Sequence, residues 1–243
     1  MIDFHTHILP GIDDGSQSIE ETEGLLREEL RQGVEQVVAT PHFYANRMSV
    51  EQFLDRRAKS IQLLEERIAN LQEEKLSELK LRYGAEVYFF TGMSRAEKLP
   101  QLCITGTNLI LIEMPFEPWT EDHLREIRHI IKERELRVVL AHVERYPEFQ
   151  RKKAVFEAVL DLPLILQLNA GSFLKSRTKR KFCLKLLKEK ENVILGTDTH
   201  NLSSRPPRLA EAREVIIDKM GSGRIDLIDT QMRNMLNEST GTF

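Results

Sequence analysis

Cysteine is scarce, since the 243 residues contain only Cys103 and Cys183. Two distant cysteines in apolar surroundings exclude a disulfide framework and a cysteine-rich zinc site, and we expect both to pack as small apolar side chains. A cysteine-dependent phosphatase needs an arginine six positions after its nucleophile, whereas those positions hold Leu109 and Glu189. The sequence therefore excludes thiol catalysis.

The sequence also lacks a large excess of charge of one sign and lacks long apolar runs. The formal net charge is -3, so no overall field draws the chain to nucleic acid or to a membrane surface. No window approaches the ~20 apolar residues of a membrane span, and the first residues lack the basic segment of a signal peptide. We expect a cytoplasmic protein, with residues 1–243 forming one domain.

Short apolar, β-branched segments recur along the chain, and a longer amphipathic stretch follows each of them. This alternation is typical of repeated βα units around a parallel sheet. No glycine-rich fingerprint follows the first segment, which favours an α/β barrel of seven units over an open dinucleotide-binding sheet, although an open sheet stays possible. The expected strands are 1–4, 35–40, 79–86, 109–113, 137–141, 164–168 and 193–196.

The first expected helix is marked at both ends. Ser18-Ile19-Glu20-Glu21 has the arrangement of a capping box, and apolar residues with helical spacing then continue to Gly33. The segment 50–79 repeats apolar residues among many charges, which predicts one or two long helices with a solvated face. Further helices are expected at 120–135, 147–160, 178–189, 208–220 and 226–236.

Histidines and acidic residues gather where the expected strands end. In parallel α/β folds the loops after the strands form one face, so residues far apart in the sequence meet there. We therefore expect nine potential metal ligands on this face: His5, His7, Asp14, His42, Glu86, Glu113, His142, Asp198 and His200. The other two histidines, His123 and His129, fall on a helix and are interpreted as surface or packing residues.

Two of these segments place ligands two residues apart. Alternate side chains of a strand share a face, so the histidines of His5-Thr6-His7 can bind one cation, and Asp198-Thr199-His200 repeats the arrangement. Mixed nitrogen and oxygen ligation suits manganese, iron or zinc, and we expect manganese.

Each residue also has a plainer interpretation. A single histidine at a strand end is more often structural, but five together favour a metal site. Asp13 and Asp14 could form a turn with Gly15. Glu113 precedes Met114-Pro115 and could simply end its strand.

Ordered motifs support a family resemblance. The start of the chain, Met1-Ile2-Asp3-Phe4-His5-Thr6-His7 with Asp13-Asp14-Gly15, resembles the polymerase and histidinol phosphatase (PHP) superfamily. Later motifs resemble its bacterial capsule and exopolysaccharide tyrosine phosphatase branch, and the match extends to about residue 236. These motifs are Ala39-Thr40-Pro41-His42, Gly84-Ala85-Glu86, Leu111-Ile112-Glu113, Ala141-His142-Val143-Glu144-Arg145 and Thr197-Asp198-Thr199-His200-Asn201 with Arg205-Pro206-Pro207.

The resemblance implies a distorted (β/α)7 barrel similar to a TIM barrel, a cluster of three metal ions usually described as manganese, and hydrolysis of phosphotyrosine on a bacterial tyrosine kinase. It places the metal ligands at the same nine positions and the phosphate-binding arginines at Arg145 and Arg205. A surface ion pair is the alternative for either arginine. The segment after His42, including Arg47, is variable in such proteins.

The implied chemistry needs no protein nucleophile, because a hydroxide held between two cations would attack phosphorus directly. The metal ligands alone do not fix the leaving group, so a small ester such as histidinol phosphate is an alternative substrate. Phe116-Glu117-Pro118-Trp119 could supply an aromatic wall for a phenyl ring or could serve packing. A non-catalytic regulator is a further alternative, whereas a nuclease would bring a basic groove that this sequence lacks.

Overall fold

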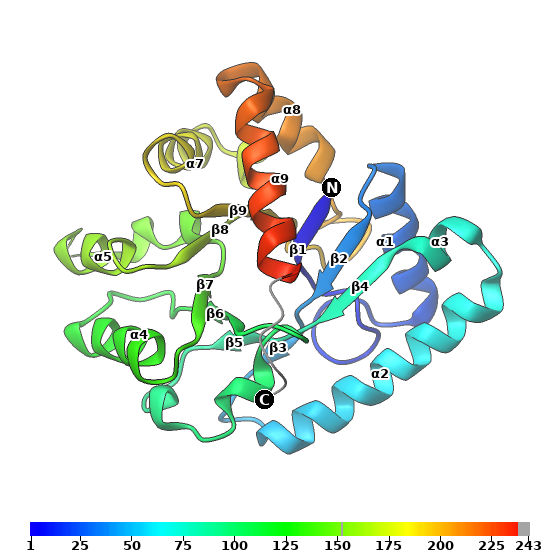
Figure 1. Cartoon of the computed structure of the whole chain (residues 1–243), viewed down its shortest axis with the longest axis horizontal. Helices are drawn as coiled ribbons and strands as arrows, with labels where there is room; N and C mark the ends of the chain where they lie inside the picture. Colours follow the sequence, from blue (N-terminus) through cyan, green and yellow to red (C-terminus); the bar gives the residue numbers. More distant parts are fainter. Residues whose placement is uncertain (152, 238–243) are drawn as a thin grey trace.

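The computed structural model describes residues 1–151 and 153–237. In this part of the chain, nine strands, all paired in parallel, lie at the centre of the fold (Figure 1). One sheet has the order β1-β2-β4 and the other the order β3-β5-β6-β7-β8-β9. The strands are β1 (Ile2–Thr6), β2 (Gln36–Ala39), β3 (His42–Phe43), β4 (Lys80–Tyr83), β5 (Glu86–Tyr88), β6 (Leu109–Glu113), β7 (Arg137–Leu140), β8 (Ile165–Asn169) and β9 (Val193–Gly196).

Two of the seven expected strands are each interrupted once. The expected strand 35–40 stops at β2 and resumes as β3 beyond Pro41, which has no backbone N–H to donate. The expected strand 79–86 stops at β4 and resumes as β5. The pairing keeps one register across both breaks, because Ala39 is opposite Tyr83 and His42 is opposite Glu86. The bond from Gly84 N to Ala39 O (2.8 Å) continues the ladder between them.

The ring of strands closes between β9 and β1. Asp198 N donates to His5 O at 2.8 Å, and His7 N donates to Thr199 O at 2.9 Å, on either side of a parallel bridge between Thr6 and Thr199. Seven strand positions therefore form a distorted barrel, as the sequence predicted. Closure also brings the two ligand pairs, His5 with His7 and Asp198 with His200, onto adjacent strand ends.

Helices surround the strands (Figure 1). They are α1 (Ile19–Arg31), α2 (Val50–Leu71), α3 (Glu74–Glu78), α4 (Glu121–Glu133), α5 (Lys153–Leu160), α6 (Ser172–Lys175), α7 (Arg177–Glu189), α8 (Leu209–Met220) and α9 (Ser222–Asn237). Among the described residues, no helix combines the length and apolar character that a membrane span needs.

The helix predictions needed three corrections, and one alternative left open was decided. Ser18 caps α1 by accepting from Glu21 N, but the Glu21 carboxylate accepts from Gln17 N, so the expected capping box is incomplete. The segment 50–79 forms two helices, the second of the two expected arrangements, and they separate at Gln72, which has a left-handed φ of 52°. A 3-10 turn, Pro147–Phe149, precedes α5, and the last helix starts four residues earlier than expected.

Strands that are buried on both sides of the sheet place some of their polar side chains inside the barrel. All five residues of β8, Ile-Leu-Gln-Leu-Asn, are buried, and alternate side chains of a strand point to opposite sides. Gln167 and Asn169 therefore share one side of β8, as Asp3 and His5 share one side of β1. This alternation supplies the polar lining of the metal centre.

Candidate metal centre

The fold brings all nine predicted ligands together. Glu86 lies at the middle of the cluster, where its Oε2 is 3.3 Å from His5 Nε2, 3.2 Å from His7 Nε2 and 3.0 Å from His42 Nδ1. Its other oxygen, Oε1, is 2.9 Å from His142 Nε2. One fully buried carboxylate thus contacts four imidazoles from three strand ends, since His5 and His7 both lie at the end of β1.

The remaining predicted ligands complete the cluster. Glu113 Oε1 is 3.2 Å from His142 Nε2, and Asp198 Oδ1 is 3.4 Å from His7 Nε2. Asp14 Oδ1 lies 3.5 Å from His42 Nε2 and 3.6 Å from His200 Nε2. The Asp14 side chain is 69% exposed, whereas the other eight side chains are buried or nearly so. Asp14 therefore lies at the solvent side of the cluster.

The donor atoms of the cluster fit bound cations. Three overlapping groups have ligand atoms within 4.8 Å of one another: His7 with His42 and His200, His5 with His7 and Glu86, and His42 with Glu86 and Glu113. Four buried atoms in the cluster make no well-directed hydrogen bond, namely His42 Nδ1, Glu86 Oε2, His142 Nδ1 and His200 Nε2, although the first two lie 3.0 Å apart. Buried polar atoms are normally paired, so unpaired lone-pair donors at this density indicate a place for cations.

Side chains behind the cluster orient the imidazoles. Gln167 Oε1 is 3.0 Å from His5 Nδ1 and accepts from His142 N at 2.7 Å. Asp13 Oδ2 is 2.8 Å from His7 Nδ1 and accepts from His42 N at 2.9 Å. In His5 and His7, therefore, the partner side chain contacts Nδ1 and leaves Nε2 facing the cluster. Metal-binding histidines are commonly oriented in this way by groups behind them. Sequence reasoning missed Gln167 and left Asp13 open between a turn residue and a member of the site.

Two glycines allow close packing beside the ligands. A Cβ on Gly15 would lie 2.2 Å from His7 O, and a Cβ on Gly196 would lie 2.7 Å from His5 Cβ. Nearby, His142 and Asp198 have positive φ angles of 31° and 55°, a region that non-glycine residues rarely adopt. Such strain gathers at functional sites, because surrounding contacts must hold it in place.

The electrostatics keep two buried carboxylates of the cluster, Glu86 and Asp198, charged. Burial opposes ionisation of Glu86 and Asp198, but the imidazoles around Glu86 and the Arg145 guanidinium beside Asp198 hold the pKa of each carboxyl well below its usual value. Burial also opposes charge on His142, yet hydrogen bonds with Glu113 and Glu86 raise its pKa to about 9. Burial and the charge of His7 lower the pKa of His200 to about 3.

Both predicted arginines contact one oxygen of Asp198. Arg205 Nη2 is 2.6 Å from Asp198 Oδ2, and Arg145 Nη2 donates to the same oxygen. Asn169 Nδ2 donates to it as well, at 2.8 Å. The arginines are therefore not ordinary surface ion pairs, because the carboxylate that holds them is buried within the cluster.

Aromatic side chains lie beside the cluster. The Phe116 ring is 38% exposed and stacks on His142, with centroids 5.8 Å apart and planes 17° apart. Tyr44 lies over His42 with centroids 5.2 Å apart, and Arg47 covers the Tyr44 ring at 4.4 Å. The expected aromatic wall at 116–119 is therefore formed by Phe116 alone of its two rings. Trp119 serves packing, because it is buried and donates to Pro115 O.

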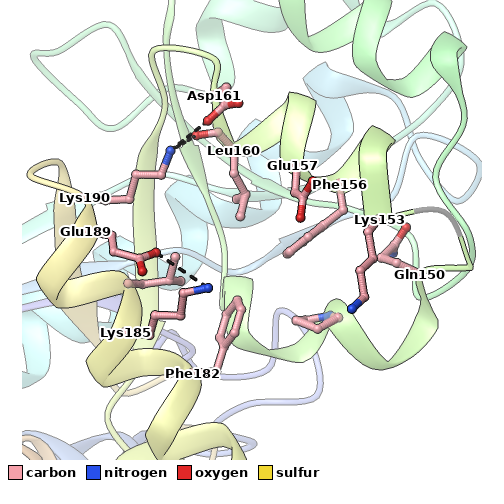
Figure 2. Close-up of a pocket in the computed structure, with 12 residues that line it drawn as sticks. Gln150, Lys153, Phe156, Glu157, Leu160, Asp161, Phe182, Lys185, Glu189 and Lys190 are labelled. Atoms are coloured by element: carbon pink, nitrogen blue, oxygen red, sulfur yellow. Dashed lines mark hydrogen bonds and ion pairs between the residues drawn. The ribbon is translucent and has the colours of Figure 1, made fainter.

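The two histidines assigned to a helix lie outside the cluster. His123 Nδ1 accepts from Thr120 N at 2.9 Å and caps α4, while His129 on the same helix is exposed. A cavity of about 530 Å³ between α5 and α7 also lies away from the cluster (Figure 2). Figure 2 shows Phe156 and Phe182 within it and charged residues such as Lys185 around it, and no histidine lines it.

Sequence and structure comparisons identify the relatives of this chain. The model of the family described as capsular polysaccharide synthesis, CpsB/CapC, matches residues 1–236. The chain belongs to this family. Its relatives include the tyrosine-protein phosphatase CpsB of Streptococcus agalactiae, which is 29% identical over 232 residues covering 92% of this chain and 93% of the relative. The tyrosine-protein phosphatase YwqE of Bacillus subtilis is 27% identical, with 91% of this chain and 86% of the relative covered.

Solved structures support the CpsB/CapC fold. The crystal structures described as YwqE from Bacillus subtilis and CpsB from Streptococcus pneumoniae, unique metal-dependent tyrosine phosphatases, give a match with a TM-score of 0.84 at 22% identity. That match covers 100% of this chain and 96% of the other. The phosphotriesterase homology protein from Escherichia coli, with phosphate in its active site, matches with a TM-score of 0.52 at 12% identity, covering 93% and 94%.

Proposed function

We propose that this CpsB/CapC protein is a metal-dependent phosphoric monoester hydrolase that removes phosphate from phosphotyrosine in a protein of capsule or exopolysaccharide synthesis. The observation that carries the proposal is Glu86, a buried carboxylate that contacts four imidazoles, beside two arginines on Asp198. Relatives named tyrosine-protein phosphatases support the reaction.

The nine clustered side chains would hold the metal ions. Three donor groups overlap, because His7, His42 and Glu86 each belong to two of them, and this overlap supports a cluster of three cations. Five imidazoles and four carboxylates without thiolate suit manganese, with iron and zinc as alternatives. Bound cations would polarise the phosphate and lower the pKa of water toward neutrality.

The residues of the chain provide the rest of the chemistry. Arg145 and Arg205 offer planar donors to phosphate oxygens, and they stabilise the charge that develops as the ester bond breaks. Asp198 keeps both guanidinium groups beside the cluster. Glu86, Asp13 and Gln167 hold the imidazoles in place, so the ligand geometry is set before substrate arrives.

Phe116 favours an aromatic ester. Its exposed ring stacks on His142, so a phenyl ring whose phosphate lies at the cluster can pack against it. Tyr44 beside His42 offers a second ring. Histidinol phosphate also has a ring, but its imidazole is joined to the phosphate through a flexible alkyl chain, so it is not held next to the phosphate as the phenyl ring of phosphotyrosine is. The substrate kinase and the cytoplasmic location of the chain stay predictions.

A paired assay tests the proposal. The metal-loaded protein is given a phosphotyrosyl peptide and histidinol phosphate in separate reactions at equal concentration, and released phosphate is measured. Faster turnover of the peptide supports the proposal, and faster turnover of histidinol phosphate overturns the assignment to phosphotyrosine. Absence of turnover with both, together with less than one metal ion per chain, would identify a non-catalytic regulator.

A further inference from the structure

A second cavity, of about 280 Å³, adjoins the metal centre on its arginine side. It lies at the ends of β8 and β9, beside the start of α7 and the loop that leads into α8, and we call it the basic pocket. Its charged lining residues are Asp198 and five cations: Arg145, Lys175, Lys179, Arg205 and Arg208. Five cations around one small cavity are unexpected in a chain whose net charge is -3.

The carboxylates near the pocket leave part of this positive charge unbalanced. Asp198 is shared by two arginines, as described above. Lys179 Nζ is 3.4 Å from Glu148, and Arg208 pairs with Glu211, but both of these carboxylates are at least half exposed to water. Lys175 Nζ donates to the Ser204 carbonyl at 3.2 Å. Glu144 is a second buried carboxylate beside the pocket, where it accepts from Ser172 Oγ at 2.7 Å. The carboxylates paired with Lys179 and Arg208 are partly solvated, so these two cations and Lys175 can still attract an anion.

The pocket and the metal centre share a wall. Arg145, Arg205 and Asp198 line the basic pocket, and Asp198 Oδ1 faces His7 and His200 in the cluster. A peptide whose phosphate lies at the cluster and the arginines therefore has its neighbouring residues within reach of the pocket. The aromatic rings of Phe116 and Tyr44 stack on other ligands, His142 and His42. The rings and the pocket can thus contact different parts of one substrate.

We propose that the basic pocket binds a second anionic group of the substrate, carried by a residue next to the phosphotyrosine. The inference rests on the proposed phosphatase function and extends it to the sequence around the target. Lysines act as compact point charges, so either a carboxylate or a second phosphate can satisfy them. The pocket would therefore select acidic or multiply phosphorylated segments over neutral ones.

Steady-state kinetics with four substrates test the inference. The substrates are p-nitrophenyl phosphate and three phosphotyrosyl peptides whose neighbouring residues are neutral, glutamate or phosphoserine. The variants are Lys179→Ala and the double variant Lys175→Ala with Lys179→Ala. Lys179→Ala is also measured alone, because Lys175 donates to the carbonyl of Ser204 and its removal could shift the neighbouring Arg205. Lys185→Ala is the matched control, since it removes a lysine of the same helix at the separate cavity of Figure 2.

The double variant should lose roughly three- to tenfold in kcat/KM, mainly through KM, with the glutamate and phosphoserine peptides. Lys179→Ala should show a smaller loss with the same two peptides, and for both variants the turnover of p-nitrophenyl phosphate and of the neutral peptide should match the Lys185→Ala control. If the loss is larger with the phosphoserine peptide than with the glutamate peptide, the pocket binds phosphate. If these two peptides lose the same factor, the pocket accepts either anion. Equal losses for neutral and acidic peptides would overturn the inference and leave the phosphatase intact. If the parent protein hydrolyses none of the four substrates, the proposed function fails and the inference fails with it.

Discussion

Arg205 Nη2 lies 2.6 Å from Asp198 Oδ2, while the other oxygen of the same carboxylate, Oδ1, lies 3.4 Å from His7 Nε2. Asp198 thus connects the arginines to the imidazole cluster through one buried side chain. The positive φ of Asp198 and the bond from its backbone N to His5 O hold it at the closure of the barrel. The proposed phosphate-binding donors and the proposed metal ligands are therefore positioned by the same residue.

Removal of one arginine should impair turnover without removing metal. Arg145→Ala is expected to lower kcat by about 10²- to 10³-fold, the usual cost of losing one preorganised donor to a developing anion. Arg145→Lys should restore little, because an ammonium cannot provide two parallel donors. Turnover and metal content are measured on the same preparations. Turnover of Arg145→Ala within a few-fold of the parent, at equal metal content, would contradict the assignment.

Loss of the outer partner of His7 should weaken metal binding. Asp13→Asn keeps the size of the side chain but removes the carboxylate that faces His7 Nδ1, and metal affinity should fall by about 10- to 100-fold. Calorimetric titration of the metal-free protein measures this change. Asp122→Asn, an exposed aspartate on α4, is the matched control. Equal affinity in both variants would show that Asp13 serves only the turn with Gly15.

Truncation of the exposed ring beside His142 should affect aromatic substrates selectively. Phe116→Ala removes a stacking surface worth about 0.5–1.5 kcal/mol, so kcat/KM for a phosphotyrosyl peptide should fall roughly two- to tenfold. Hydrolysis of an alkyl phosphate should change little. Exposed Leu202→Ala provides the control for loss of apolar surface. If both classes of ester lose the same factor, Phe116 supports the ligands and does not recognise the ring.

A buried acid behind the site should make stability depend on pH. Neither oxygen of Glu29 has a hydrogen-bond partner, and burial together with the neighbouring Asp3 raises the pKa of Glu29 well above its usual value. The native state then holds a proton that the unfolded chain releases above about pH 4.5. The parent therefore loses stability as the pH rises through this window, by up to about 1.4 kcal/mol per pH unit from this group.

Glu29→Gln removes that loss. The variant should be more stable than the parent at pH 8, and the difference should shrink toward pH 4.5. Urea unfolding of both proteins across this range measures the difference, with Glu35→Gln, an exposed glutamate after α1, as control. A difference that does not change with pH would contradict the assigned shift.

The sequence predicted the barrel and the convergence of the ligands because both depend on simple periodicities. Apolar segments alternating with amphipathic ones predict βα units, and parallel strands bring their carboxyl ends to one face. The breaks at Pro41 and Gly84 were missed because an interrupted strand that keeps its register has the same apolar pattern as a continuous one. Gln72 and residues 147–149 changed helix boundaries through local backbone conformations that apolar periodicity does not report.

The supporting residues of the site were harder to predict. Gln167 and Asn169 carried a signal, since they are polar residues two positions apart on an otherwise apolar strand. Asp13 carried none that separates it from a turn residue. Its contact with His7 Nδ1 depends on how the loop folds back, which neighbouring sequence does not determine. The basic pocket joins residues that lie between β7 and α8, from Arg145 to Arg208, so no single segment shows it.

Hydrolysis of a phosphotyrosyl peptide by the metal-free protein, titrated with manganese, tests the central claim most directly. The parent should gain turnover as manganese is added. The double variant His5→Ala with His7→Ala should bind less metal and remain inactive at saturating manganese, while His129→Ala, an exposed histidine on α4, should behave as the parent does. Turnover that is independent of added metal, or that survives in the double variant, would contradict a metal centre built around Glu86.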